Sequence, residues 1–178
     1  MKLSIISTSQ QKNSQSKRVS EIFKNQILEI DNNIECFNLD MFENKIPLWT
    51  SEKSEDLSFW RDRLDKISAH LNSSDGFIFV VPEYGGMASP SAKNFFLIFN
   101  SGELFHKPGL IVSISSGNGG AYPISELRSS SYKNTHVLWI PENIIIRNVN
   151  QFLPGKHGEL IPGWMDDRIK YSLNLLIK

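Results

Sequence analysis

Short apolar runs alternate with longer stretches of helical periodicity along the whole chain. Five runs have the length and composition of strands, at residues 2–6, 33–39, 76–81, 109–115 and 135–140. Elsewhere apolar side chains recur every three to four positions, which predicts helices over 14–30, 56–71, 91–101, 122–131 and 164–178. Irregular stretches are expected over 40–55 and 144–163.

The third and fourth predicted strands are apolar almost throughout, which is typical of strands covered by helices on both faces of a parallel sheet. Because strands and helices alternate, right-handed crossovers give a doubly wound α/β sheet. The chain has 178 residues and no linker, so residues 1–178 are expected to form one domain. In such folds a ligand binds outside the carboxyl ends of the strands, and the loops there deserve the closest reading.

The charge balance argues against two classes of partner. Nineteen basic and nineteen acidic side chains cancel, which leaves no general electrostatic basis for binding nucleic acid or an acidic membrane. No apolar run is long enough for a signal segment or a bilayer span, so we expect a cytoplasmic protein. The single cysteine, Cys36, cannot form a disulfide within the chain and is expected to pack as a small apolar side chain.

Hydroxyl side chains gather in the loop between the first predicted strand and the first predicted helix. Ser9, Ser14 and Ser16 lie where free N–H groups and the helix dipole attract a phosphate. The same residues also suit an N-cap followed by a solvated loop, and the residues alone leave both interpretations open. The common dinucleotide and P-loop fingerprints are absent from the sequence.

Two further loops offer backbone groups in place of reactive side chains. Pro82 ends the third strand, and Gly85-Gly86 let the chain approach a ligand closely or take a positive φ. Gly119-Gly120 follow the fourth strand in the same way. Such loops suit the polar edge of a flat ring. The alternatives are that Glu83 is a solvated acid, that Tyr84 is an aromatic side chain at a rim, and that the glycines after the fourth strand form a flexible turn.

These three loops resemble the NAD(P)H-dependent FMN reductase family of flavodoxin-like proteins, which includes quinone, chromate and azo-dye reductases. The family's middle motif is similar to T-P-E-Y-N-x-S-x-P-x-x-L-K-N and is matched at the same spacing by Pro82, Glu83, Tyr84, Lys93 and Asn94. Its first motif, G-S-x-R-x-x-S-x-N/S, is matched by Ser9, Ser14 and Ser16. Its later Gly-Gly and Leu-Arg pairs resemble Gly119-Gly120 and Leu127-Arg128, one residue closer together. The resemblance covers essentially the whole chain.

The resemblance implies a flavodoxin-like three-layer sandwich, with a five-stranded parallel sheet of order 2-1-3-4-5 and helices on both faces. It also implies FMN as the cofactor and NADPH or NADH as the electron donor. The chemistry would occur at flavin N5, so no catalytic side chain and no metal is expected. The implied cofactor-binding residues are Ser9, Gln11, Ser14, Gln15 and Ser16 at the phosphate, Pro82, Glu83, Tyr84, Gly85 and Gly86 along the isoalloxazine, and Ser115, Ser116, Gly117, Gly119 and Gly120 at its pyrimidine side.

The implied partners are a small-molecule electron acceptor and further copies of the chain, as a homodimer or a tetramer. Trp49 and the helix over 56–71 are candidate elements of the acceptor pocket and of the subunit interface. The four histidines show no metal-ligand spacing.

Several positions depart from the family motifs. Thr8 replaces a glycine, Gln11 an arginine and Gly85 an asparagine. Met87 replaces a serine, and Ser89-Pro90 stand where the family has a proline and a small residue. Loss of the arginine removes a cation from the implied phosphate site, and Lys12 is the neighbour that would compensate. These departures put FMN affinity in question.

Three functions remain open at this point. The first, which we favour, is an FMN-dependent NAD(P)H oxidoreductase acting on quinones, free flavin, azo compounds or metal oxyanions. The second is a flavodoxin-type electron carrier, but such carriers are usually strongly acidic and this chain is neutral. The third is a binding or scaffold protein that keeps the fold and has lost FMN.

Overall fold

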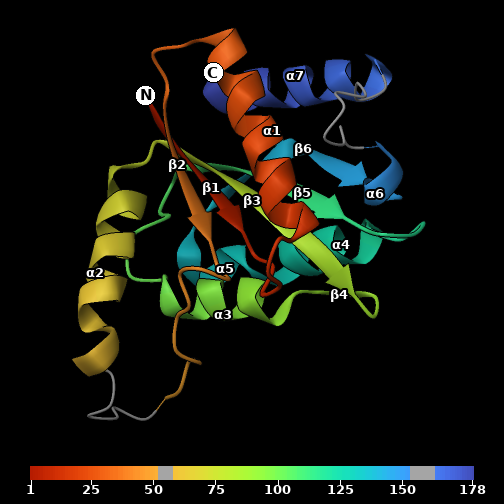
Figure 1. The fold of residues 1–178 in the computed structure, drawn as a ribbon. Coiled ribbons are helices and arrows are strands. Elements are labelled where there is room, and N and C mark those ends of the chain that lie inside the picture. Colours follow the sequence, from red (N-terminus) through yellow and green to blue (C-terminus); the bar gives the residue numbers. More distant parts are fainter. Residues whose placement is uncertain (52–57, 153–162) are drawn as a thin grey trace.

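The computed structural model describes residues 1–51, 58–152 and 163–178. A central sheet is covered by helices on both faces (Figure 1). Its strands are β1 Lys2–Ser7, β2 Glu35–Asp40, β3 Gly76–Tyr84, β4 Met87–Ala88, β5 Pro108–Ile114 and β6 Leu138–Ile146. The helices are α1 Gln15–Ile30, α2 Ser58–Ser73, α3 Pro90–Ile98, α4 Ala121–Ser130, α5 Tyr132–Thr135, α6 Val149–Phe152 and α7 Gly163–Ile177.

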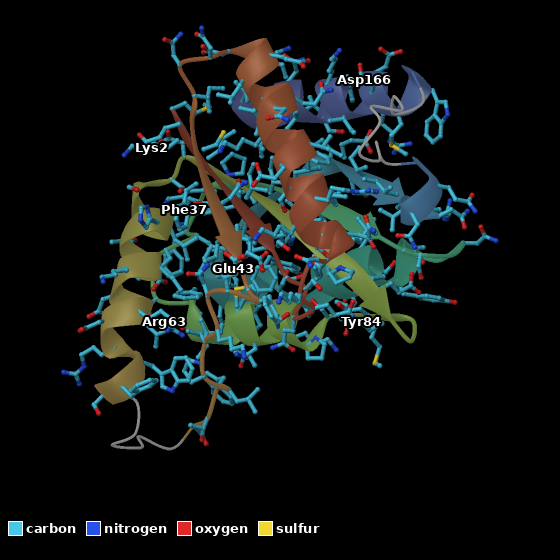
Figure 2. All side chains as sticks on the ribbon, in the orientation of Figure 1. Lys2, Phe37, Glu43, Arg63, Tyr84 and Asp166 are labelled. Atoms are coloured by element: carbon cyan, nitrogen blue, oxygen red, sulfur yellow. The ribbon has the colours of Figure 1, made fainter. Side chains whose placement is uncertain are left out.

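The strands lie in the order β2-β1-β3-β5-β6, and every neighbouring pair in this series is parallel. This is the predicted order 2-1-3-4-5, because the short β4 stands apart and pairs only with the end of β3, antiparallel to it. The predicted topology is therefore confirmed. All the carboxyl ends of the parallel strands meet at one edge of the sheet, which Tyr84 marks, while Lys2 marks the opposite edge (Figure 2).

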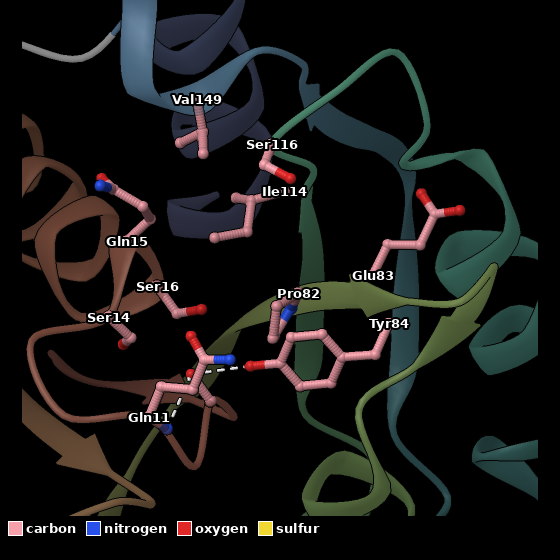
Figure 3. Close-up of a pocket in the computed structure, with 11 residues that line it drawn as sticks. Gln11, Ser14, Gln15, Ser16, Pro82, Glu83, Tyr84, Ile114, Ser116 and Val149 are labelled. Carbon is pink, nitrogen blue, oxygen red and sulfur yellow. Dashed lines mark hydrogen bonds between the residues drawn. The ribbon is translucent and has the colours of Figure 1, made fainter.

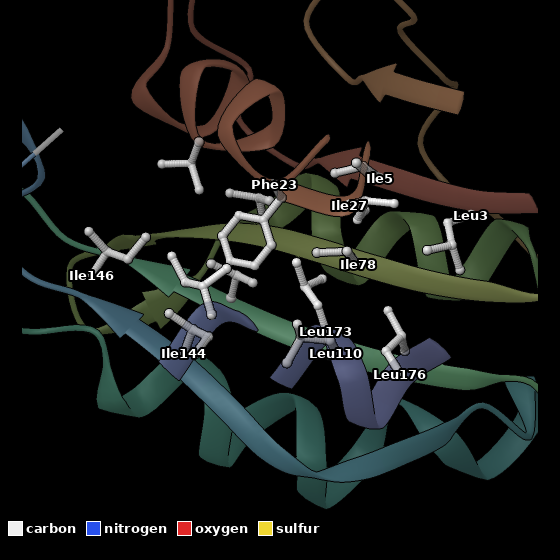
Figure 4. Packing of buried hydrophobic residues seen from close by; sticks show 14 of the residues in the cluster. Leu3, Ile5, Phe23, Ile27, Ile78, Leu110, Ile144, Ile146, Leu173 and Leu176 are labelled. Atoms are coloured by element: carbon white, nitrogen blue, oxygen red, sulfur yellow. The ribbon is translucent and has the colours of Figure 1, made fainter. Parts of the chain in front are cut away.

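Two apolar clusters, one on each face of the sheet, hold the layers together. Ile78 of β3 faces the cluster that includes side chains of α1 and α7, where Phe23 lies close to Leu110 and Leu173 (Figure 4). The next residue of β3, Phe79, faces the opposite cluster with α2, α3 and α4. Each fully buried side chain of this size contributes about 1.5–3 kcal/mol. The apolar run of β3 therefore arises because both of its faces are covered.

Helix α1 begins where the hydroxyl-rich loop predicted it. Ser14 is the N-cap, and its Oγ accepts the Lys17 backbone N–H at 3.2 Å. Val19, Phe23 and Ile27 recur every four residues and are fully buried against the sheet. This packing fixes the start of α1 at the carboxyl edge of the sheet.

The prediction was wrong at the end of the last strand. We expected residues 135–140 as a strand and an irregular stretch from 144, but Thr135 ends α5 and β6 runs from Leu138 to Ile146. Pro141 interrupts the apolar pattern, and β6 tolerates it because β6 is an edge strand whose register with β5 shifts between Gly109 and Ile111. Residues 153–162 of the expected irregular stretch lie outside the described residues.

The hairpin between β3 and β4 was not predicted. Gly85 and Gly86 have φ angles of 59° and 79°, as the two central residues of a tight hairpin turn require. Tyr84 pairs with Met87 across this turn. The two glycines therefore form the hairpin turn. From the sequence alone, such a turn could not be distinguished from a loop that approaches a ligand.

Helix α2 buries less than its apolar stripe suggested. Ile67 and Leu71 are buried, whereas Trp60 and Leu64 are half-buried and Phe59 is 79% exposed. Leu57, which belongs to the same run of apolar residues spaced three to four positions apart in the predicted helix over 56–71, lies outside the described residues. Within the described residues, no helix has both the length and the apolar character needed to cross a bilayer.

Candidate functional site

A cavity of about 290 Å³ lies at the carboxyl ends of β1, β3 and β5 (Figure 3). Its volume is at the lower end of the range for small-molecule sites. The residues that line it are Ser9, Gln11, Ser14, Gln15, Ser16, Pro82, Glu83, Tyr84, Ile114, Ser116 and Val149. The first two predicted loops therefore meet in space, and the third contributes its beginning.

The first turn of α1 forms one end of the cavity. The Ser16 side chain is almost fully buried, and its Oγ has no hydrogen-bond partner. A buried hydroxyl without a partner is costly, which points to an external group that supplies one. The free N–H groups of a helix N-terminus lie beside it, so this end of the cavity suits an anion.

The first and second loops are joined across the cavity. Ser9 Oγ lies 3.0 Å from the Tyr84 hydroxyl oxygen, in a hydrogen bond that either group can donate. Ser9 Oγ also accepts the Gln11 backbone N–H at 3.2 Å. These bonds place the Tyr84 ring across the cavity between β3 and the first loop (Figure 3).

The second and third loops are joined by Glu83. Its carboxylate accepts the backbone N–H of Gly120, which is the N-cap of α4 in the left-handed conformation. A Cβ added at Gly119 would lie 2.8 Å from Cδ of Glu83, so the carboxylate occupies the space that a side chain at residue 119 would take. The side chain of Glu83 is therefore bonded to the backbone of the third loop. We expected this region to contribute backbone groups and did not predict a role for the carboxylate.

The rest of the third loop is held from β6 and the residues after it. The Arg147 Nε–H donates to the carbonyls of Asn118 and Gly119, at 2.8 and 3.0 Å. The Asn148 N–H donates to the Gly117 carbonyl at 2.9 Å. Ser115 turns its hydroxyl to the Gly117 N–H at 3.3 Å and does not line the cavity.

Six predicted residues thus do not line the cavity: Gly85, Gly86, Ser115, Gly117, Gly119 and Gly120. Two wall residues were missed, Ile114 and Val149. Both are apolar and buried and carry no sequence feature that separates them from the core.

Thr8, one of the departures from the family motif, points away from the cavity. It is fully buried, and its Oγ1 donates to the Val80 carbonyl at 3.2 Å and accepts the Ser89 hydroxyl at 2.9 Å. Ser91 donates to the Thr8 carbonyl. The threonine therefore joins β1 to the start of α3 and leaves the cavity unobstructed.

The other matched motif residues have structural roles. Asn94 accepts the Trp49 N–H and donates to the Pro47 carbonyl, both at 2.7 Å, and so holds the connection after β2. The Arg128 Nη2–H donates to the carbonyls of Ile140 and Glu142, at 2.6 and 2.8 Å. They order the surroundings of the cavity without lining it.

Lys93 forms an ion pair with Glu126, whose carboxylate also accepts the Ala88 N–H of β4 at 2.8 Å. Desolvation raises the pKa of Glu126, but the bonds from Lys93 and Ala88 outweigh it and hold this pKa below its usual value. Glu126 therefore stays charged and fixes the hairpin against α4.

No lysine or arginine lines the cavity among the residues described, and Glu83 is its one charged side chain. Gln11 stands where the family motif has an arginine, and Lys12 does not line the cavity. The anion-binding end therefore depends on hydroxyl and N–H donors alone.

These donors fit the phosphate of FMN, because an unpartnered Ser16 hydroxyl, two further serine hydroxyls and a helix N-terminus converge there. The other end, bounded by Pro82 and the loop after β5, offers backbone groups and an apolar wall, which suit the edge and face of a flat ring. The residues present thus fit the cofactor that the sequence resemblance implied.

Comparison with known proteins was made at three levels. Residues 1–151 match the family model described as NADPH-dependent FMN reductase. A comparison with curated protein sequences gave no significant match. Solved structures are similar in fold at low sequence identity.

An oxidoreductase from Corynebacterium diphtheriae is 14% identical with a TM-score of 0.75, and 98% of this chain and 93% of that chain are covered. The flavoenzyme NAD(P)H:(acceptor) oxidoreductase FerB from Paracoccus denitrificans is 14% identical with a TM-score of 0.76, with coverage of 99% and 94%. An FMN-dependent NADH-azoreductase from Bacillus anthracis, in complex with FMN, is 12% identical with a TM-score of 0.68 and full coverage of both chains, 100% and 100%. These likenesses confirm the flavodoxin-like fold. The family match covers most of the chain, and we conclude that it belongs to the NADPH-dependent FMN reductase family and is a flavin-dependent oxidoreductase with FMN as its cofactor and a reduced nicotinamide nucleotide as its donor.

Proposed function

We propose that this chain passes electrons from NADPH or NADH, through bound FMN, to a small acceptor such as a quinone, free flavin, an azo compound or a metal oxyanion. FMN, when bound, supplies the hydride and electron transfer. The protein is left to bind and orient the rings, which agrees with a cavity lined by hydroxyls, backbone and apolar groups.

In this proposal Ser9, Ser14 and Ser16 hold the FMN phosphate, together with N–H groups at the start of α1. Gln11 and Gln15 lie at the rim of the phosphate end. The isoalloxazine lies along residues 82–84, and its pyrimidine edge faces residues 115–120. Gly85 and Gly86 act indirectly, by turning the hairpin that presents Glu83 and Tyr84.

We further infer a single domain, a cytoplasmic location and a homodimer. The described elements share one sheet and two core clusters, which supports one folding unit. The apolar side chains of Leu48, Trp49 and Phe59 are 81%, 48% and 79% exposed. Exposed apolar side chains near one another along the chain support a subunit contact through α2 and the connection before it.

The observation that carries the proposal is the unpartnered, buried hydroxyl of Ser16. Ser16→Ala is expected to weaken FMN binding about tenfold to a hundredfold, because it removes a hydrogen bond to a charged oxygen. The same change should leave the stability of the cofactor-free protein equal or slightly higher, because the lost hydroxyl had no partner. Titration of FMN fluorescence and urea unfolding measure the two effects.

Ser20→Ala is the matched control. Ser20 is buried one turn further along α1, and its hydroxyl donates to the Ser16 carbonyl at 2.9 Å without lining the cavity. It should cost stability and leave FMN affinity close to that of the wild type. If Ser16→Ala binds FMN as well as the wild type does, the phosphate is held elsewhere.

The reaction is tested on the wild-type protein by loading it with FMN, removing the excess and adding NADPH or NADH without air. Bleaching of retained flavin bands, and their return on adding a quinone, is the expected result. Retained flavin that neither nucleotide bleaches would contradict the reductase function and favour an electron carrier.

A further inference from the structure

We propose that Glu83 is a positioning residue whose carboxylate fixes the loop after β5 at the ring end of the cavity and whose charge lowers the reduction potential of the bound flavin. The inference rests on the proposed function, because it assumes that FMN occupies this cavity. It extends that function because the expected contacts between this segment and the flavin use the main chain, whereas the role proposed here belongs to the Glu83 side chain.

The geometry of β3 sends two neighbouring side chains to two different loops. Successive residues of a strand point to opposite sides, and Tyr84 and Glu83 leave β3 in opposite directions (Figure 3). Tyr84 reaches Ser9 of the loop after β1, and Glu83 reaches Gly120 of the loop after β5. The end of β3 is therefore bonded to the loop after β1 through Tyr84 and to the loop after β5 through Glu83.

The loop after β5 is shaped to receive this carboxylate. Glu83 occupies the space of a side chain at Gly119, where the backbone conformation itself permits alanine. The next residue, Gly120, donates its N–H to the carboxylate, and its φ of 102° turns the chain into α4 directly after this contact. Both glycines thus favour the contact with Glu83: Gly119 leaves room for the carboxylate, and Gly120 donates its N–H to it.

The same loop is held from its other side by a cation. Arg147 binds the carbonyls of Asn118 and Gly119, whereas Glu83 binds the N–H group of Gly120. The loop is clamped through its acceptors by Arg147 and through a donor by Glu83. Loss of the carboxylate should release the donor side of this clamp, at the Gly120 N–H.

The charge of Glu83 is not balanced by any lysine or arginine among the residues lining the cavity. A negative charge beside a flavin opposes the arrival of electrons, because reduction adds negative charge to the ring. Removing the charge while keeping the acceptor oxygen should therefore raise the midpoint potential. Glu83→Gln makes this change.

The positioning role is tested first on the cofactor-free protein, by hydrogen exchange at the Gly120 amide. Glu83→Ala should speed exchange about tenfold to a hundredfold, the range expected for a hydrogen bond to a charged acceptor, whereas Glu83→Gln should speed it much less. Gly119→Ala should act like Glu83→Ala, because its methyl group displaces the carboxylate. The double variant Glu83→Ala/Gly119→Ala should then exchange no faster than Glu83→Ala alone.

Additive effects of the two changes, or exchange in Glu83→Ala at the wild-type rate, would overturn the positioning role. This experiment needs no flavin, so it judges the contact even if the wild-type protein fails to retain FMN and the proposed function falls.

The charge effect is tested by redox titration of the FMN-loaded proteins. Glu83→Gln should shift the midpoint potential upward. The control is Glu126→Gln, which alters a carboxylate that also accepts a backbone N–H of this hairpin but does not line the cavity, and it should leave the potential unchanged. An unchanged or lower potential in Glu83→Gln would refute the charge effect, as would equal shifts in both variants.

Discussion

Replacing Gln11 by arginine is expected to tighten FMN binding about tenfold to thirtyfold at low salt. Gln11 lines the cavity and is exposed, so the dielectric constant of water is the appropriate one. Two unit charges 4 Å apart in water attract by about 1 kcal/mol, and a phosphate monoester carries a charge of about −1.5 to −2. The gain is therefore about 1.5–2 kcal/mol, and 1.4 kcal/mol corresponds to a factor of ten.

The assay is a titration of the cofactor-free protein with FMN, followed by flavin fluorescence at about 0.01 M and 1 M salt. The Debye length falls from about 30 Å to about 3 Å between these concentrations, so the gain should largely disappear at the higher one. Gln10→Arg is the control, because it adds the same charge at an exposed neighbour that does not line the cavity. Equal gains from both variants, or a gain that persists in high salt, would refute the local electrostatic argument.

Three further outcomes are expected from unfolding experiments. Thr8→Gly should lower the free energy of unfolding by about 2–4 kcal/mol in urea, because it removes buried atoms and leaves the Ser89 hydroxyl without its acceptor. Since the folded-state pKa of Glu126 is lowered, its stabilising effect is present above its unfolded pKa and is lost as pH falls through the folded value. The stability difference between wild type and Glu126→Gln should therefore shrink between neutral and acidic pH, and a constant difference would argue against this linkage. Gly120→Ala should cost about 1–3 kcal/mol in thermal unfolding because its φ is 102°, whereas Gly117→Ala, with open space around it, should cost less.

The parts of the fold that local sequence determines were predicted well. The start of α1 follows from Ser14 as N-cap and from apolar residues at 19, 23 and 27, which all interact within one helix and its nearest strand. The strand order came from the family resemblance and not from the pattern itself. The end of β6 was missed because Pro141 interrupts the pattern, and only pairing with β5 shows that the strand continues.

The contacts that shape the candidate site join residues far apart in the sequence, and this explains what the pattern did not reveal. Glu83 meets Gly120 across 37 positions, and Ser89 meets Thr8 across 81. A carboxylate that binds a glycine N–H looks the same in sequence as one that faces solvent. Motif matching predicted Glu83 as a cofactor-binding residue, and Glu83 lines the cavity, but its contact with the third loop appears only in the folded chain.

The two bonds made by Asn94 have a consequence for how this protein can vary. Asn94 holds the connection after β2 through the Pro47 carbonyl and the Trp49 N–H, and both of these are main-chain atoms. The anchor therefore does not depend on which side chains the connection carries. Leu48 and Trp49, both exposed, can be exchanged without loosening the backbone that presents them. Because Asn94 binds only main-chain atoms of this connection, its exposed side chains can be substituted at little cost to folding.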